Sequence, residues 1–353
     1  MLDQLVSASG VATVVVNLVK GIHDCNQDIA VYGTCEPRLV AELTTYGATV
    51  HQLPYITAGF GLHFVQAFRE LLRDQQYDVV HGHLINSAFI YLSLAKRLGV
   101  SNRIIHAHSA IGSDSVAKRL RNKLLALPLP CLATTYVSIS PQAAKASFGR
   151  TRATRIIPNG IDTARFAYNP KSRHRLRHEL AISDTTLCVG HVGRFSKLKN
   201  HGFLLAVFHQ LRSRQDCVLL LAGEGPLEQQ IRAQVVSLGL TDSVRFLGPR
   251  TDIENIYQAM DVLVMPSLSE GFGLAALEGY IAGLACVLSN RFPVLSADSS
   301  YMVKLPLENS VTWVTAILNA PKLRNQQPFT EFTTAQMCEH MYSLYKGMVS
   351  SHD

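Results

Sequence analysis

One segment of the 353-residue sequence places two carboxylates close to the start of a predicted helix. Residues 266–278 read PSLSEGFGLAALE and follow a short apolar run. Ser269 or Glu270 can cap a helix that begins near Phe272, and the free N–H groups of a helix start bind anions. Glu278 follows Glu270 by about two helical turns, so the two share nearly one azimuth. The pattern suits a phosphorylated ligand with several hydroxyl groups; a capping glutamate followed by an ordinary surface glutamate is the alternative.

A second segment, residues 189–201, gathers cations at the end of a predicted strand. Gly193 ends the strand, and Arg194, Lys197 and Lys199 follow before the next helix. Arginine offers a planar fork of donors to phosphate oxygens, and lysine offers a mobile point charge. Basic residues in such loops are often only solvated, but a position at the carboxyl end of a strand favours binding.

Four histidines stand at the ends of two further predicted strands, as His81-x-His83 and His106-x-His108. The spacing is compatible with a metal site, although alternate residues share a face only while a strand continues. No cysteine or carboxylate lies close in sequence to complete a ligand set, so no metal is expected. For each histidine taken alone, a structural role is the more frequent one.

Short runs of β-branched and apolar residues alternate with helical patterns along the chain. The predicted strands are 28–33, 78–81, 103–107, 136–139, 155–157, 187–192, 218–222, 244–247, 262–265 and 285–289. Near-continuous apolar runs are typical of parallel strands covered on both faces, so the chain is predicted to be α/β with doubly wound parallel sheets. The pattern occurs on both sides of a polar, basic stretch near 167–184, which predicts two domains and a linker. Ligands of such sheets bind at the carboxyl ends of the strands, here expected between the domains.

Composition excludes several classes of protein. Apolar residues make up 47% and charged residues 17%, which excludes a disordered chain. Seven cysteines without a CxxC pair indicate a reduced compartment, and no apolar window is long enough to cross a membrane. The N-terminus lacks the basic region of a secretory signal, so a cytoplasmic location is expected. The GxGxxG fingerprint, the Walker loop and Asp-x-Asp are all absent, which disfavours nicotinamide enzymes, nucleotide-hydrolysing P-loop proteins and many metal-dependent sugar-nucleotide enzymes.

The net charge of +7 is unevenly distributed. Residues 1–166 hold 16 Lys and Arg against 10 Asp and Glu, whereas the remainder is nearly neutral. Residues 116–127 place apolar side chains on one helical face and Lys118, Arg119, Arg121 and Lys123 mostly elsewhere. Such a helix suits an anionic membrane surface, and an ordinary surface helix packed on the sheet is the alternative.

Several motifs occur together in one order along the chain. They are 78–81 (DVVH), 157–166 (IPNGID…F), Gly193-Arg194…Lys199-Asn200, 244–252 (VRFLGPRTD) and Glu270-x7-Glu278. Together they make the chain resemble family 4 (group 1) of the retaining GT-B glycosyltransferases, especially bacterial enzymes of exopolysaccharide and capsule synthesis. The resemblance extends from about Ser9 to the C-terminal helix.

The resemblance implies a fold and an activity. Two Rossmann-like domains would face a cleft, with an acceptor-side domain at 1–166, a nucleotide-sugar domain at 185–330, and a C-terminal helix at 331–353 that packs back on the first. The activity would be retaining, metal-independent hexosyl transfer from a nucleoside-diphosphate sugar, with a UDP-sugar favoured by analogy. The acceptor would be a glycan or a polyprenyl-diphosphate-linked glycan, which fits a cytoplasmic protein peripheral to the inner face of the membrane. No cofactor, metal or nucleic acid is implied.

The resemblance also assigns residues. Arg194 and Lys199 would stabilise the departing nucleoside diphosphate, where negative charge develops in the transition state. Glu270 would lie by the donor sugar, together with His108 or, as second choice, His106. Donor binding would further involve Gly10, Gly193, Gly248, Arg250, Gly271, Phe272, Gly273, Leu274 and Glu278. In this scheme Glu278 binds the ribose hydroxyls and residues 248–251 line the base pocket. Front-face displacement would then let the leaving phosphate help deprotonate the acceptor hydroxyl.

Two departures from the family pattern are visible. The sequence begins almost at the loop where Ala8-Ser9-Gly10 replaces a common Gly-Gly pair, so the first domain is expected to lack about one strand. A late start, a rearranged sheet or a compromised first domain would each explain it. Gly279 stands where alanine is usual, at a cost of ~1 kcal/mol in helix propensity.

Rival functions remain open at this stage. A non-catalytic or regulatory relative would fit an incomplete first domain, although the donor-side motifs are complete. A sugar-nucleotide epimerase would need a catalytic carboxylate set in the first domain, and a phosphorylase a lysine that holds pyridoxal phosphate. No sequence pattern demands either, and no nucleic-acid-binding motif is present.

Overall fold

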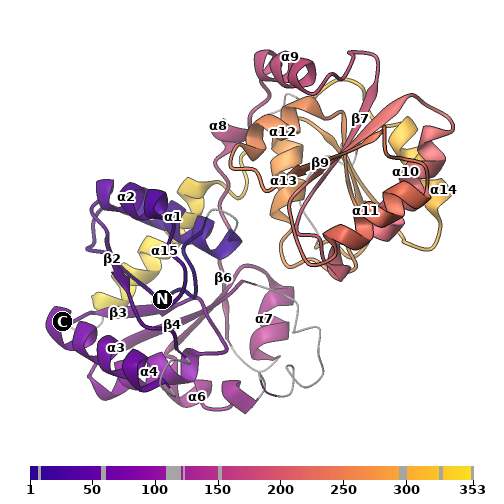
Figure 1. Cartoon of the computed structure of the whole chain (residues 1–353). Helices are drawn as coiled ribbons and strands as arrows, with labels where there is room; N and C mark the ends of the chain where they lie inside the picture. The colour runs from indigo at the N-terminus through magenta and orange to yellow at the C-terminus, as the bar shows by residue number, and fades with distance from the viewer. Residues whose placement is uncertain are drawn as a thin grey trace. The chain divides into compact units, whose positions relative to one another are not determined.

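The chain, seen in a computed structural model, divides into two compact units (Figure 1). The first holds residues 1–160 and 332–353, and the second holds residues 161–331. The structure describes residues 1–6, 9–56, 61–108, 121, 124–149, 153–293, 300–325 and 329–350. Most of the cationic helix expected over 116–127 therefore lies outside the described residues. The division falls at residue 160, ahead of the predicted linker.

The second unit is built on one parallel sheet of six strands. Its strands are β7 (Leu187–Val192), β8 (Cys217–Ala222), β9 (Val244–Gly248), β10 (Val262–Met265), β11 (Ala285–Ser289) and β12 (Met302–Leu305). They are ordered β12-β11-β10-β7-β8-β9, and every pairing is parallel. The strand order reverses between β7 and β10, which makes that junction the place where ligands bind in sheets of this kind.

Helices cover both faces of this sheet. The helical elements are α8 (Thr163–Phe166), α9 (Pro170–Glu179), η2 (Lys197–Lys199), α10 (His201–Arg212), α11 (Glu228–Ser237), α12 (Ile253–Ala259), α13 (Leu274–Ile281) and α14 (Ser310–Leu318). Phe208 of α10 and Trp313 of α14 belong to the apolar cluster that includes Val264 of β10. On the opposite face α13 approaches closely, because a Cβ on Gly279 would lie 2.6 Å from Leu263. The glycine that interrupts the family pattern therefore permits close helix–sheet packing.

The predicted linker over 167–184 is instead largely helix α9, which packs on α12. The Arg177 side chain is only 1% exposed, and its guanidinium lies 3.2 Å from an oxygen of Asp261. Arg173 pairs with the same carboxylate at 2.6 Å. Arg177 can be buried and Arg173 half-buried because Asp261 and nearby carbonyl groups accept their hydrogen bonds. The polar stretch is thus part of the second unit.

The first unit contains two separate groups of parallel strands. Strands β1 (Asp28–Val31) and β2 (Thr49–Gln52) form one pair. Strands β3 (Val79–Gly82), β4 (Asn102–Ala107), β5 (Thr135–Ser138) and β6 (Arg155–Ile156) form a four-stranded sheet in that order. The sequence predicted five of these six strands and missed β2.

Residues 1–5 lie between the two groups, where the sequence analysis expected a missing strand. Leu2 forms an isolated parallel bridge with Val31 of β1. On the other side, the Met1 ammonium donates to the His81 carbonyl of β3 at 3.0 Å. The segment therefore links both groups through a few backbone hydrogen bonds without forming a regular strand.

The described helices of the first unit are α1 (Gly10–Gly21), α2 (Pro37–Thr45), α3 (Leu62–Gln75), α4 (Ala88–Arg97), α6 (Leu129–Leu132), α7 (Pro141–Phe148) and α15 (Thr334–Val349). Helix α2 packs on the pair β1 and β2, and other helices pack on both faces of the four-stranded sheet. Leu18 of α1 and Met341 of α15 pack with Ile104 of β4. Ile105, on the other face, packs with Leu92 of α4. The C-terminal helix α15 is thus part of the first unit. Among the described residues, no helix combines the length and apolar character that crossing a membrane requires.

Candidate active site

The loops after β7 and β10 carry the residues of greatest chemical interest in the second unit. Strands β7 and β10 are direct neighbours, with Val189 opposite Val262. Arg194 and Lys199 follow β7, and Glu270 follows β10. A backbone hydrogen bond from Leu268 N–H to the Leu198 carbonyl at 2.8 Å joins the two loops. The fold therefore brings together the residues predicted to hold a diphosphate and a sugar.

Two glycines of the loop after β8 support the loop after β7. A Cβ on Gly223 would lie 2.2 Å from the Gly193 carbonyl oxygen, and one on Gly225 would lie 2.5 Å from that of Phe195. The residues Gly223-Glu-Gly225, which fail as a dinucleotide fingerprint, thus permit two backbones to pack closely. This contact fixes the loop that carries Arg194, and the sequence analysis did not foresee it.

Lys199 and Arg194 differ in their surroundings. Lys199 Nζ donates to Glu270 Oε1 at 2.5 Å, and the two side chains are 20% and 12% exposed. Ser267, which is fully buried, donates its hydroxyl to the same oxygen at 2.7 Å. Arg194 is exposed, and among the described residues its guanidinium has no hydrogen-bond or ion-pair partner. One cation is thus held by a carboxylate while the other is available to an incoming anion.

The helix after β10 begins later than the sequence predicts. Helix α13 starts at Leu274, and its N-cap is Gly273 in the left-handed region at φ +85°. A Cβ there would also press on the Phe292 ring at 2.9 Å. The prediction that Ser269 or Glu270 caps this helix is therefore wrong. Glu270 instead accepts hydrogen bonds within the loop, and the stretch from Gly271 to Leu274 forms the turn into the helix.

Glu278 lies in α13 beside a tyrosine that the sequence analysis did not single out. The Tyr257 hydroxyl donates to Glu278 Oε2 at 2.8 Å and lies 3.1 Å from the Ala275 carbonyl oxygen. Desolvation raises the pKa of Glu278 above its usual value, although the hydrogen bond from Tyr257 acts in the opposite direction. Tyr257 is fully buried, so it fixes one carboxylate oxygen.

Residues 248–251, which were predicted to line a base pocket, contact other residues of the second unit. The Gly248 carbonyl accepts from the Gly223 N–H at 2.9 Å, which ties it to the loop after β8. The Arg250 guanidinium faces Asp252 instead, at 2.8 Å through two nitrogens. Burial alone would raise the pKa of Asp252, but Arg250 outweighs it and lowers the pKa.

Two buried histidines lie beneath the loop after β7. His191 Nδ1 lies 2.8 Å from the Val264 carbonyl oxygen, and its ring centroid is 4.7 Å from that of His201. The His201 side chain is 3% exposed. Burial, together with the nearby charge of Lys199, lowers the pKa of His201 to about 4. Both imidazoles are therefore neutral near pH 7, next to the loop after β7.

The remaining predicted site residues belong to the first unit. Gly10 is the first residue of α1, whose N-cap is Ser9. His108 follows the last residue of β4, and its Nε2 lies 2.8 Å from His83 Nδ1. Burial lowers the pKa of His108 to about 3. His106, the second choice, is almost completely buried. Of these two residues, His108 is the less buried.

Two family models match the chain. The model for Glycosyltransferase Family 4 matches residues 8–165, and that for Glycosyl transferases group 1 matches residues 172–297. The chain belongs to the group 1 glycosyltransferases of the GT-B fold. It is an enzyme of the transferase class, and nucleotide-sugar binding is a property of this group.

Similar group 1 glycosyltransferases occur among characterised and named proteins. "Putative glycosyltransferase EpsF" of Bacillus subtilis is 29% identical over 342 residues, covering 93% of this chain and 89% of that protein. The Escherichia coli "UDP-Gal:alpha-D-GlcNAc-diphosphoundecaprenol alpha-1,3-galactosyltransferase" is 26% identical over 232 residues, covering 63% of this chain and 60% of that one.

Solved structures agree with the fold. The Anabaena protein Alr3699/HepE, crystallised with UDP-glucose, superposes with a TM-score of 0.82 at 18% identity, covering 98% of each chain. Sucrose-phosphate synthase of Thermosynechococcus elongatus has a TM-score of 0.76 at 20% identity, covering 99% of this chain and 96% of that one. The expected architecture of two Rossmann-like domains with parallel sheets is thereby confirmed.

Proposed function

We propose that this glycosyltransferase moves a hexosyl group from a UDP-sugar to a glycan or a lipid-linked glycan acceptor in exopolysaccharide or capsule synthesis. Transfer proceeds with retention of the anomeric configuration and without a metal ion at the diphosphate. The observation that carries this proposal is the convergence of Arg194, Lys199 and Glu270 at the switch point between β7 and β10.

The two cations suit a leaving nucleoside diphosphate. Arg194 is exposed and unpaired among the described residues, so its fork of donors can bind phosphate oxygens without first breaking a contact. Lys199 is already positioned by Glu270. As the sugar–phosphate bond breaks, negative charge grows on the phosphate, and fixed cations then stabilise the transition state more than the bound substrate.

The carboxylates suit the sugar and the ribose. Oε1 of Glu270 accepts hydrogen bonds from both Lys199 and Ser267, and Oε2 can then accept one from a hydroxyl of the bound sugar. Because two hydrogen-bond donors stabilise the Glu270 carboxylate, it is a weak nucleophile. This favours a role in binding the sugar over the formation of a covalent glycosyl intermediate. Glu278, fixed by Tyr257 at one oxygen, can accept from two neighbouring hydroxyls of a ribose.

Retention without a covalent intermediate places the proton transfer on the substrate itself. The departing diphosphate oxygen accepts the proton of the acceptor hydroxyl as that hydroxyl attacks the same face of the sugar. His108 contacts the donor sugar in this scheme and orients it. Its position just beyond the carboxyl end of β4, where ligands of parallel sheets bind, supports that role.

The relatives support the substrate classes. The HepE structures hold UDP and UDP-glucose, and the E. coli relative is named for transfer of galactose from UDP-galactose to a diphosphoundecaprenol-linked sugar. A lipid-linked acceptor would place this chain at the cytoplasmic face of a membrane during turnover. The charge of residues 1–166 is compatible with an anionic lipid surface.

A ligand screen followed by product analysis tests this proposal. Thermal unfolding is measured with UDP, GDP and ADP and with their sugars; UDP compounds at 100 times their Kd are expected to add about 2.7 kcal/mol to the free energy of unfolding. The product of the best UDP-sugar is then examined by NMR for its anomeric configuration. Stabilisation by GDP or ADP alone would overturn the donor assignment, and an inverted product would overturn the mechanism.

A further inference from the structure

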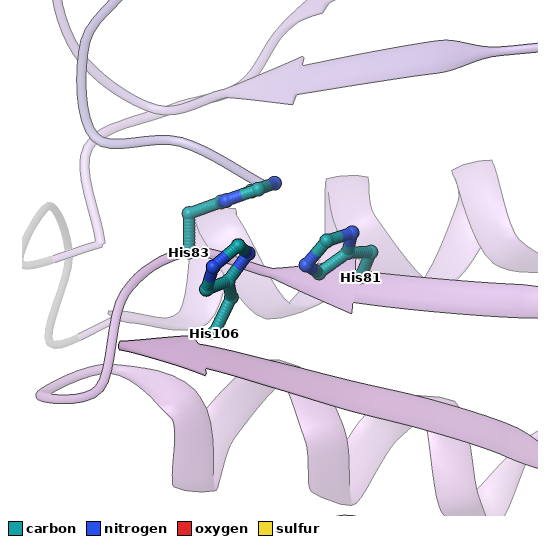
Figure 2. Close-up of side chains that lie close together, drawn as sticks. All are labelled: His81, His83 and His106. Atoms are coloured by element: carbon teal, nitrogen blue, oxygen red, sulfur yellow. The ribbon is translucent and has the colours of Figure 1, made fainter. Parts of the chain in front are cut away.

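Four histidines of the first unit lie on one face at the carboxyl ends of β3 and β4. The register pairs Gly82 with Ile105, which sets His83 beside His106. Although β3 ends at Gly82, the side chain of His83 keeps to the face of His81, with ring centroids 4.2 Å apart. Figure 2 shows the rings of His81, His83 and His106 gathered above the two strand ends. The alternate residues His81 and His83 therefore share one face of the sheet.

Among the described residues, several ring nitrogens in this cluster have no hydrogen-bond partner. The His106 ring is 2% exposed, and neither of its nitrogens has a partner in the part of the chain that the structure describes. Nε2 of His81 is also buried without a partner among these residues. A neutral imidazole carries one N–H donor and one acceptor, and leaving either unpaired in the interior costs roughly 1–3 kcal/mol. The apolar packing around β4 does not satisfy these nitrogens.

The other nitrogens of His81 and His83 are oriented by neighbours. His81 Nδ1 lies 2.7 Å from the Tyr345 hydroxyl oxygen, and His83 Nδ1 lies 2.8 Å from His108 Nε2. Metal-bound histidines have this arrangement, in which one nitrogen binds the ion while the other contacts a nearby polar group. Two of the three rings are thus held by the kind of contact that prepares Nε2 for an ion.

We propose that His81, His83 and His106 bind one divalent transition-metal ion of the zinc class. Each ring offers one nitrogen, and these nitrogens all lie within 4.8 Å of one another. Tetrahedral coordination at about 2.1 Å sets ligand nitrogens about 3.4 Å apart, so small ring rotations close the site. An all-imidazole set selects Zn²⁺, Ni²⁺ or Cu²⁺ over the oxygen-preferring Mg²⁺ and Ca²⁺.

Three protein ligands leave one coordination position open. An open position on zinc takes a water molecule or an oxygen of a substrate. His108 lies next to His83, with ring centroids 5.0 Å apart, and continues the cluster just past the end of β4. The sequence analysis expected no metal, because it looked for carboxylates and cysteines near in sequence rather than for histidines on a neighbouring strand.

The test measures metal binding directly, with no sugar nucleotide present. Untagged full-length protein is stripped with a chelator, equilibrated with Zn²⁺, and assayed for bound metal and for Kd by competition with a chromophoric chelator. One zinc per chain is expected. His106→Gln should weaken binding at least tenfold, and Tyr345→Phe, which removes only an orienting contact, should weaken it about tenfold to a hundredfold.

His63→Gln is the matched control, since His63 is an exposed histidine on α3 of the same unit. It should bind zinc as the wild type does. Failure of wild-type protein to bind more zinc than His106→Gln would overturn the proposal. If His106→Gln does not fold, X-ray absorption of wild-type zinc protein decides: three imidazole nitrogens support the site, and fewer overturn it. Because substrate is absent, these results do not depend on the glycosyl-transfer proposal.

Discussion

The ammonium of Lys199 and the carboxylate of Glu270, 71 residues apart in the chain, meet at 2.5 Å across the ends of two adjacent strands. Neither side chain is free in solvent, since the two are 20% and 12% exposed. Each therefore fixes the position of the other before any ligand arrives. A bound diphosphate would compete with Glu270 for Lys199, so the pair couples the phosphate end of the donor to its sugar end.

Glu270→Gln keeps the shape of the side chain and removes its charge. We expect kcat for sugar transfer to fall about a hundredfold, because the amide no longer positions the Lys199 ammonium beside developing phosphate charge. Ser267→Ala removes only one donor to the same oxygen and should cost about tenfold or less. Steady-state kinetics of both variants measure this order, and a larger loss for Ser267→Ala would contradict it.

Arg194→Ala removes a cation of the loop after β7 that has no partner among the described residues. Loss of one donor to the transition-state charge is expected to lower kcat/KM about 100- to 1,000-fold. Arg194→Lys should recover part of the activity, since it keeps the charge but loses the planar fork. Lys197→Ala, an exposed cation in the same loop, should remain within about twofold of wild type; an equal loss there would mean that only local net charge matters.

Tyr257→Phe removes the hydroxyl that fixes Glu278 Oε2. If Glu278 binds the ribose equally in the substrate and transition-state complexes, KM for the donor should rise about tenfold with kcat nearly unchanged. Tyr301→Phe is the control, because its hydroxyl donates to the Leu323 carbonyl in the same unit. A fall in kcat without a change in KM would show that this pair acts on the reacting atoms instead.

Gly223→Ala places a methyl group 2.2 Å from the Gly193 carbonyl oxygen, at a φ of +133° that side chains rarely adopt. Both backbones would have to separate, so we expect a loss of about 2–4 kcal/mol in the free energy of unfolding, together with loss of activity. Gly202→Ala in α10 meets no atom closer than 3.7 Å and should stabilise by up to about 1 kcal/mol. Denaturant unfolding of the two variants measures both; equal effects would contradict the close approach.

His201 makes the stability of the second unit depend on pH. Its pKa of about 4 in the folded state lies below its ordinary value of 6.5, so at intermediate pH the unfolded chain binds more protons. The contribution of neutral His201 is complete above pH 6.5 and is lost as the pH falls toward 4, by about 3 kcal/mol. Equilibrium unfolding as a function of pH should therefore show a shallower loss in His201→Gln.

Other buried histidines also lower the free energy of unfolding as the pH falls. Only the difference between the His201→Gln and wild-type curves therefore reports on His201. His209→Gln, on the exposed face of the same helix, should leave the wild-type curve unchanged. A His201→Gln curve parallel to that of wild type would show that His201 titrates alike in the folded and unfolded chain.

The strands that the sequence located best are those in the middle of the sheets. The runs 187–192, 262–265 and 285–289 coincide with β7, β10 and β11, because a strand covered on both faces is apolar along its length. Strands β2 and β12 escaped detection because they lie at sheet edges and their residues are mostly partly exposed. Without a continuous apolar run or a clear alternation, such strands resemble loops.

The candidate site was predictable where one short segment holds its own chemistry. Arg194, Lys199 and Glu270 were chosen from local motifs, and the fold gathers them. Ser267 and Tyr257 were not, since a serine hydroxyl or a buried tyrosine acquires its role only from the partner that folding supplies. The helix cap was placed wrongly because polar side chains such as Ser269 can cap a helix, yet the observed N-cap is Gly273, three residues after Glu270.

The first unit has a seam, by which we mean the junction at residues 1–5 between the pair β1 and β2 and the four-stranded sheet. Strands β1 and β2 with α2 and part of α1 form an apolar cluster around Val31 and Leu43, separate from the clusters on the two faces of the four-stranded sheet. A two-stranded sheet is marginal by itself, so we expect this region to open locally more readily than β3 to β6. Its backbone amides would then exchange with solvent well before those of Ile104 and Ile105, and the seam would let one part of the unit move without unfolding the whole.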